Sequence, residues 1–253
     1  MPSFNKTLFC SILLLTGFTL LSRNGFSQQT ALWHAQTMLL NLMQYKPVDD
    51  QLTAIAEISQ TQLQTELSTD SLKKTFWIYL YNSAVQLNLT DSASRANEKE
   101  FFGKKVIKVA GHHLSLYDIE NGMLRKSRRT KFRMYGSKWF VSDFEKKFRV
   151  SQRDWRVFFA LNTGVVNDPV ISFYSSELLD YEIQREVLRY FKKNTLDSVL
   201  TISPVFKRYL HDAGGIEVIH QWALGNKVHF KTIRYKIVPG PLHPRKFLSG
   251  ENL

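Results

Sequence analysis

The sequence is almost without cysteine, since Cys10 is the only one in 253 residues. Cys10 lies inside an apolar run of 14 residues, 8–21, which has the length of a signal-peptide core and is short for a membrane span. Lys6 precedes this run and small residues follow it, so we expect cleavage after Ser27, with an uncleaved anchor as the alternative. The mature chain would then contain no cysteine, which excludes disulfides, thiolate metal sites and a cysteine nucleophile.

A second long apolar run is also missing, because no later segment is apolar enough to cross a membrane. We therefore expect an exported protein, periplasmic or extracellular, from which the signal peptide 1–27 is removed. The remaining length suits one domain. We divide it into a helical lead-in at 28–69, a main domain at 70–240 and a C-terminal tail at 241–253.

Positive charge is concentrated in one part of the chain. The whole sequence has a net charge of +12, and residues 102–153 hold 14 basic and 4 acidic residues, a net charge of +10. Within this part, "RKSRRTKFRMYGSKWF" mixes aromatic residues with Arg128, Arg129 and Arg133, a pattern typical of surfaces that bind nucleic acid or anionic polymers. Export argues against nucleic acid, which leaves an anionic cell-envelope component, such as lipid headgroups or polysaccharide, or an acidic protein. A solvated basic face over core aromatics is the other interpretation.

Hydrophobic spacing predicts a mixture of helices and strands. Helices are expected at 30–45, 52–67, 71–89, 175–194, 204–213 and 216–224. Strands are expected at 106–109 and 112–116, as a hairpin, and at 155–162, 198–202 and 228–238. The order of these elements indicates an α+β fold, in which a helical N-terminal part packs on a small mixed or antiparallel sheet in a single domain.

Several helix starts carry capping residues. Asp49 or Asp50 is a candidate cap for the second helix, and Ser175 or Ser176 for the fourth. A further helix is expected after the hairpin, with Ser115 as its cap and Asp118 three residues later, a variant of the capping box.

Asn82 lies in a helix that is otherwise apolar almost all round. A buried amide needs hydrogen-bond partners, because an unsatisfied polar group costs about 1–3 kcal/mol. Asn82 therefore either pins the helix to a loop backbone, such as the "LNTG" turn, or contacts a ligand.

Four stretches resemble a known family. "FWIYLYNSAV", "FFGKKVIKVAGHHLSLYDIENGMLR", "VFFALNTGVVNDPVI" and "SPVFKRYLHDAGG" occur in the same order as the landmarks of the family called domain of unknown function 547. The resemblance covers roughly residues 70–240. It implies a secreted bacterial protein of a family whose function is not established.

The resemblance also shows what this sequence has lost. The family pattern has a His and two Cys where this chain has Phe158, Thr163 and Asp168, and a second His where it has Asn121. It thus implies that the thiol and imidazole groups of a former site are replaced. Cysteine chemistry requires a thiolate activated by a base, so that mechanism is excluded.

We expect a noncatalytic exported domain that binds a partner or an anionic surface. The alternative is a hydrolase or transferase that acts through Asn162, Thr163 and Asp168 at the turn. Glu120 is a further catalytic candidate, although it also suits an ion pair with a basic residue.

Polar side chains that suit binding are Asn82, Asn121 and Asn162. We expect no cofactor. No metal site is expected either, because adjacent histidines such as His112 and His113 point to opposite faces of a strand.

Overall fold

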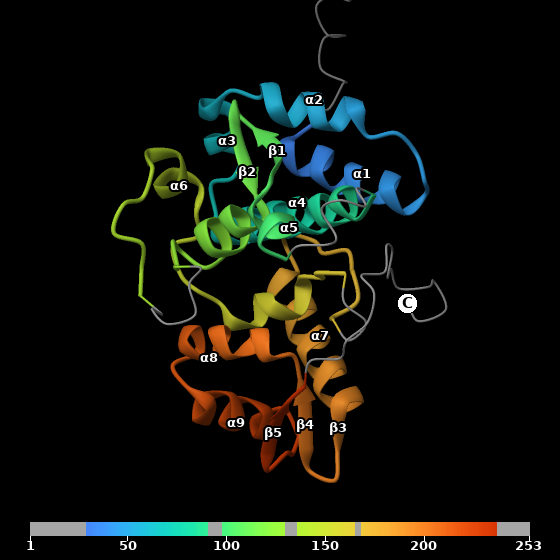
Figure 1. Cartoon of the computed structure of the whole chain (residues 1–253), viewed down its shortest axis with the longest axis vertical. Coiled ribbons are helices and arrows are strands. Elements are labelled where there is room, and N and C mark those ends of the chain that lie inside the picture. The colour runs from blue at the N-terminus through green and yellow to red at the C-terminus, as the bar shows by residue number, and fades with distance from the viewer. Residues whose placement is uncertain (1–28, 91–97, 130–135, 165–167, 237–253) are drawn as a thin grey trace, which may run out of the picture. The chain divides into compact units, whose positions relative to one another are not determined.

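The computed structural model describes residues 29–90, 98–129, 136–164 and 168–236 (Figure 1). The chain divides into Met1–Thr30, of which Gln29 and Thr30 are described, and Ala31–Leu253. The predicted signal peptide and its cleavage site, the tail and Arg133 lie outside the described residues.

Among the described residues, five helices precede the first strand. They are α1 (Ala31–Met43), α2 (Asp49–Glu57), α3 (Gln60–Glu66), α4 (Asp70–Thr90) and α5 (Glu98–Gly103). The single helix predicted at 52–67 is wrong, because the backbone of Ile58 is extended and separates α2 from α3. Ser59 then caps α3 by accepting the N–H of Gln62 at 3.1 Å.

The predicted aspartate cap of the second helix is also wrong. Asp49 and Asp50 lie inside the first turn of α2, and the residue before the helix, Val48, makes no side-chain cap. Carboxylates in a first turn still stabilise a helix, because they face the positive end of its dipole.

The predicted hairpin is confirmed. Strands β1 (Lys105–Val109) and β2 (His112–Ser115) are antiparallel and joined by Ala110 and Gly111, both with positive φ. The N–H groups of this turn donate to carbonyls of α2, from Ala110 to Ile55 at 3.0 Å and from Gly111 to Ala56 at 2.9 Å. The helical N-terminal part therefore packs on a small antiparallel sheet, as predicted.

The predicted capping box after the hairpin is present. Asp118 accepts the N–H of Ser115 at 2.8 Å, and the N–H of Asp118 donates to the Ser115 hydroxyl at 3.2 Å. The helix that follows is η2 (Asp118–Leu124), a π-helix. This form is often found at functional sites.

The buried strand predicted at 155–162 is wrong. Its first part is η3 (Trp155–Ala160), a 3₁₀ helix, and Asp154 caps it by accepting the N–H of Arg156 at 3.1 Å. A continuous apolar run has no periodicity that separates a strand from a buried helix. The local cap and the surrounding core decide the outcome.

The C-terminal half contains a three-stranded sheet of β3 (Thr195–Leu196), β4 (Val199–Ile202) and β5 (Thr232–Tyr235). The other elements of this half, besides η3, are α6 (Asp143–Phe148), α7 (Leu179–Asn194), η4 (Pro204–Phe206), α8 (Lys207–Ala213) and α9 (Ile216–Gly225). Strand β4 is central, antiparallel to β3 and parallel to β5.

The fourth predicted helix starts later than its sequence pattern suggested. It begins at Leu179 without a side-chain cap. The hydroxyls of Ser175 and Ser176 donate to the Glu177 carboxylate instead, at 2.5 and 2.8 Å, so the predicted serine cap is wrong.

The long helix α4 organises the core. It contacts α1, η2, β1 and α7, and its residues from Phe76 to Val85 are all buried. The ring N–H of Trp77 donates to the carbonyl of Phe148 at 2.9 Å. The α+β prediction is thus confirmed, with one unit from Ala31 onward.

A charged cluster joins α4 to the start of η3. Asp154 accepts hydrogen bonds from Lys74 at 2.8 Å and from Arg156 at 2.9 Å. Burial opposes ionisation of Asp154, but the hydrogen bonds and charges of Arg156 and Lys74 outweigh it and lower the pKa of Asp154 to about 2.

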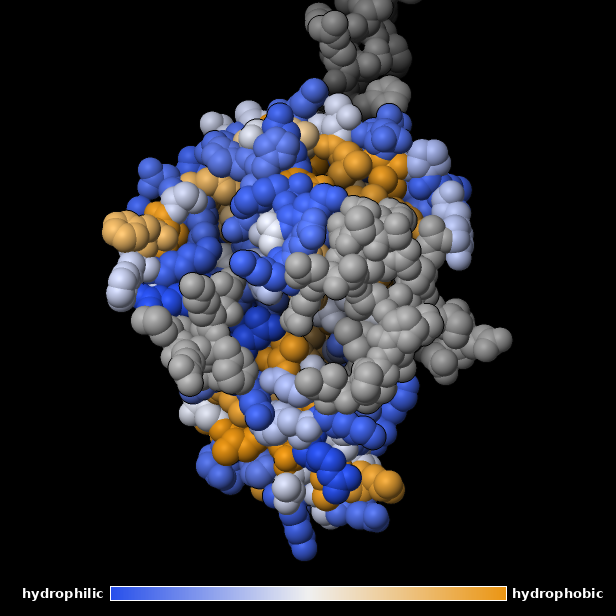
Figure 2. Space-filling view, viewed as in Figure 1, coloured by the Kyte–Doolittle hydropathy of each residue, from blue (hydrophilic) through white to orange (hydrophobic). Residues whose placement is uncertain are grey.

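Apolar side chains are exposed on parts of the face shown in Figure 2, where orange residues gather over α1 and around α8 and α9. Within the described part of the chain, every helix is too short or too polar to span a lipid bilayer.

Candidate functional site

Two buried asparagines lock the turn after η3 onto α4. The Asn82 side chain donates to the carbonyl of Ala160 at 2.9 Å and accepts the N–H of Asn162 at 3.0 Å. Both asparagine side chains are buried. This is the backbone-pinning role predicted for Asn82, and it sets the position of the "LNTG" turn.

Asn162 in turn holds the loop that follows. Its amide donates to the carbonyl of Pro169 at 2.7 Å, and its side-chain oxygen accepts the N–H of Gly164 at 2.8 Å. Gly164 has a φ of +87°, and a Cβ there would lie 3.0 Å from the end of the Leu89 side chain, so any other residue would strain the backbone and crowd Leu89. The turn is therefore built from Asn162 and Gly164 as a rigid support.

Thr163 and Asp168 are brought into contact by this support. The Asp168 carboxylate accepts the N–H of Thr163 at 2.6 Å and also accepts the Thr163 hydroxyl. The two candidate catalytic residues thus share one carboxylate oxygen. By accepting both hydrogen bonds, that oxygen links Asp168 to Thr163, five residues earlier in the chain.

Glu120 lies at the same place, although 43 residues separate it from Thr163 in the sequence. Glu120, Thr163 and Asp168 line one cavity of about 20 Å³, together with other side chains that include Tyr81, Phe158 and Tyr209. A cavity of this size holds roughly one water molecule. The structure therefore brings all three catalytic candidates together, but the cavity between them is small.

Two tyrosines that the sequence reasoning did not select complete the cavity. The Tyr209 hydroxyl donates to Glu120 at 2.9 Å, and burial followed by the charge of Glu120 raises the pKa of Tyr209 well above its usual value. Burial raises the pKa of Tyr81 in the same way, so both hydroxyls stay protonated. The Tyr81 hydroxyl is buried without a hydrogen-bond partner among the described residues.

A signal for one of these tyrosines is present in the sequence. Tyr81 directly precedes Asn82 in an apolar helix, where any polar group must be accounted for. Tyr209 lies in a distant helix and has no such local signal.

The geometry of the cavity is poor for nucleophilic catalysis. A threonine hydroxyl ionises at far higher pH than a carboxylate, so it needs a stronger base in contact with it. Asp168 is a weak base and already accepts a backbone N–H. No histidine lines this cavity among the residues that the structure describes.

A comparison with protein families finds a match to part of the chain. Residues 64–191, about half of the chain, match the family described as "Protein of unknown function, DUF547". The chain belongs to this family. No curated protein and no solved structure matches the chain.

Three of the positions at which this chain departs from the DUF547 pattern line the cavity. Phe158, Thr163 and Asp168 stand where the family resemblance places a His and two Cys, and all three line the cavity. Phe158 fills its side of the space, with its ring 5.2 Å from that of Tyr209 and 5.1 Å from that of Phe206. The substituted positions thus meet at one point of the fold.

Asn121, the fourth substituted position, faces a different environment. Its side-chain oxygen accepts the guanidinium of Arg125 at 2.8 Å, and it is not among the residues that line the cavity. Arg125 and Arg128 then converge on Asp212 of α8, at 2.6 and 2.9 Å. Asn121 therefore connects the buried π-helix to the basic segment.

The basic segment differs from the simple solvated face that was one of its two interpretations. Arg125 is buried and Arg128 is paired with Asp212, so both contribute to the fold. Arg129 stacks over Trp139 with 4.2 Å between its guanidinium carbon and the ring centroid. Trp139 and Phe140 are 80% and 92% exposed, so these aromatics are not core residues.

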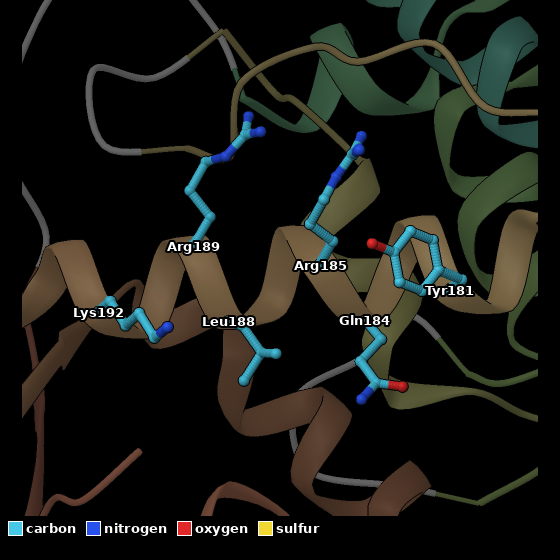
Figure 3. A pocket seen from close by; sticks show the side chains of 6 residues that line it. All are labelled: Tyr181, Gln184, Arg185, Leu188, Arg189 and Lys192. Atoms are coloured by element: carbon cyan, nitrogen blue, oxygen red, sulfur yellow. The ribbon is translucent and has the colours of Figure 1, made fainter. Parts of the chain in front are cut away.

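A second basic surface lies on α7. An open pocket of about 300 Å³ is lined there by Tyr181, Gln184, Arg185, Leu188, Arg189 and Lys192. Figure 3 shows Arg185 and Arg189 extending in the same direction from the helix, while Gln184 and Leu188 extend from its opposite edge. Both arginines lie close to the buried Glu186, at 3.7 and 3.2 Å, so part of their charge is already matched.

The two adjacent histidines of β2 have different neighbours. His112 stacks on Phe144 with ring centroids 4.2 Å apart, and it pairs with Val109 across the hairpin, whereas His113 pairs with Lys108. Among the described residues, no three metal-ligating side chains come together.

Proposed function

We propose that this protein is an exported, noncatalytic DUF547 domain that attaches peripherally to an anionic phospholipid surface of the cell envelope. The observation that carries the proposal is the exposed pair Trp139 and Phe140 beside Arg129. Exposed aromatics next to cations are the groups that settle at a membrane interface, where the ring is buried and the charge meets headgroups.

Charge complementarity supports a lipid partner. The net charge of +10 over residues 102–153 lies around these aromatics in the sequence. Each Lys or Arg near an anionic membrane contributes about 1 kcal/mol of attraction, so a few cations add substantially to two inserted rings.

The noncatalytic part of the proposal rests on the cavity. Its volume of about 20 Å³ leaves no room for a substrate, and Phe158 occupies the position of the family's histidine. The Thr163–Asp168 contact favours a second candidate, a hydrolase or transferase, because it places a hydroxyl against a carboxylate.

Vesicle co-sedimentation tests the first function. The full chain should bind vesicles that contain phosphatidylglycerol and not neutral phosphatidylcholine vesicles. Changing both Trp139 and Phe140 to alanine should weaken binding roughly tenfold or more, since burying one such ring contributes about 1.5–3 kcal/mol. Leu196→Ala is the matched control, because Leu196 is 76% exposed on β3.

Membrane attachment is contradicted if the parent protein binds neither kind of vesicle. Equal vesicle binding by the parent and the double variant would contradict the role of Trp139 and Phe140. The competing enzyme hypothesis is tested by screening peptide, ester and amide substrates with the Thr163→Ala variant alongside. Turnover by the parent that disappears in the variant would overturn the noncatalytic assignment.

A further inference from the structure

A short antiparallel bridge organises the basic segment. Arg128 pairs with Ser137, and the N–H of Lys138 donates to the carbonyl of Ser127 at 2.7 Å. The serine hydroxyls on this bridge are each reached by an arginine from the segment that begins at the end of α6. Arg149 donates to Ser127 at 2.7 Å, and Arg153 approaches Ser137 at 3.4 Å.

The same part of the fold holds four arginines, and among the described residues only two of them contact a carboxylate. Arg125 and Arg128 contact Asp212, while Arg149 and Arg153 contact serine hydroxyls, which carry no charge. Burial lowers the pKa of Arg153, and the positive charges of Arg128, Arg125 and Arg149 lower it further against the opposing effect of Asp212. The positive charges of Arg125, Arg128 and Arg149 thus act unfavourably on the Arg153 guanidinium.

The neighbouring carboxylates do not remove this excess. Lys138 and Glu145 form their own ion pair at 2.8 Å, as do Lys146 and Asp143 at 3.1 Å. The four arginines outnumber Asp212, the carboxylate that Arg125 and Arg128 contact, so this cluster of described residues is positively charged.

Arg153 also carries an unsatisfied donor. Its Nε is buried, and no acceptor for it is found among the described residues. Buried donors without partners are rare in folded proteins, and each one calls for a ligand or another specific explanation. An anion satisfies the unpaired donor and the excess charge together.

We propose that Arg128, Arg149 and Arg153 form a binding site for a phosphate-type oxyanion. The planar guanidinium fork matches the oxygens of phosphate and donates two parallel hydrogen bonds, which an ammonium group cannot do. This inference deepens the proposed function. If the protein attaches to a phospholipid surface, as proposed, the oxyanion is the phosphate of a phospholipid headgroup.

The position of the site is consistent with that role. Arg129, which stacks on Trp139, donates to the carbonyl of Ser137, the residue that Arg153 approaches. The arginine cluster and the exposed aromatics are thus held by the same bridge. A headgroup bound at the cluster would therefore lie on the segment that also presents Trp139.

Titration of the full chain with inorganic phosphate by calorimetry tests the site directly. The experiment is done at about 0.15 M salt, where exposed charges are screened beyond roughly 8 Å. Arg153→Gln should weaken phosphate binding at least tenfold, and Arg153→Lys should restore only part of it, because the charge returns without the fork. Arg185→Gln on α7 is the control for general charge and should leave binding unchanged.

A competition experiment with vesicles distinguishes a phospholipid headgroup from free phosphate as the ligand. If the ligand is a headgroup, inorganic phosphate should compete with phosphatidylglycerol vesicles, and Arg153→Gln should weaken vesicle binding. Phosphate binding without competition would support the site for free phosphate and would rule out a phospholipid headgroup as its ligand.

The site itself is overturned by either of two results. One is no saturable phosphate binding by the parent protein, and the other is an equal loss in the Arg153→Gln and Arg185→Gln variants. Vesicle binding that depends on Trp139 and Phe140 would still uphold the proposed function in either case, so the two failures are distinguishable.

Discussion

The link between Asn82 and the turn after η3 provides a sharp test of what holds the fold together. Asn82→Ala removes a donor to the carbonyl of Ala160 and an acceptor for the N–H of Asn162. Both backbone groups are then buried without partners. Each unsatisfied group costs about 1–3 kcal/mol, so we expect the free energy of unfolding to fall by roughly 2–6 kcal/mol.

Urea titration followed by circular dichroism measures this loss as a lower midpoint at an unchanged m value. Asn41→Ala is the matched control, because Asn41 lies half-buried on α1, where its amide donates to the carbonyl of Pro47 at 3.2 Å and to the Gln51 side chain at 3.4 Å. Because these hydrogen bonds are long and not fully buried, this substitution should cost about 1 kcal/mol or less.

Asn82→Asp gives a second measurement with a different physical origin. The carboxylate keeps the acceptor for Asn162 but has no proton to give to Ala160 unless it is protonated. Its deficit relative to the parent protein should therefore shrink as the pH is lowered. A loss below about 1 kcal/mol for Asn82→Ala, or one equal to that of Asn41→Ala, would refute the pinning role.

Three further predictions concern the core, acid stability and export. Trp77→Ala should lower stability by about 3–5 kcal/mol in the same titration, because it leaves a cavity in α4; a loss near 1 kcal/mol would show that the helix is peripheral. Because the folded pKa of Asp154 is about 2, below its ordinary value of 3.8, its contribution of about 2 kcal/mol is present above about pH 4 and disappears as the pH falls through about 2. Asp154→Asn should lack this part of the acid dependence, and an acid loss as large as that of the parent would contradict the assignment. Intact-mass measurement of the exported protein should show a chain that begins within a few residues of Gln28, and retention of Met1 would exclude cleavage.

Local sequence predicted the elements whose determinants lie within a few residues. The apolar helix around Asn82, the hairpin at Gly111 and the capping box of Ser115 and Asp118 are all found in the structure. Their signals are periodicity, positive φ and short-range hydrogen bonds, which do not need the rest of the fold. The errors occurred at a uniformly apolar run, at helix starts and at the break near Ile58 within a predicted helix, where local signals are ambiguous.

The candidate site was predictable only in part, for the same reason. Thr163 and Asp168 were selected from one turn, and their contact closes that turn. Their meeting with Glu120 and Tyr209 depends on how η2 and α8 pack, and packing between distant segments has no local sequence pattern. The size of the cavity, which argues against catalysis, likewise follows from side chains that four separate segments supply.

The sequence by itself determined the family, the α+β class and the concentration of positive charge between residues 102 and 153. Only the tertiary structure decided which of those charges are matched. Asp212 lies more than 80 residues after Arg125 and Arg128, yet it neutralises part of their charge, while Arg149 and Arg153 meet neutral hydroxyls. Electrostatic energy depends on distance in space rather than along the chain, so composition shows that an excess exists but not where it lies.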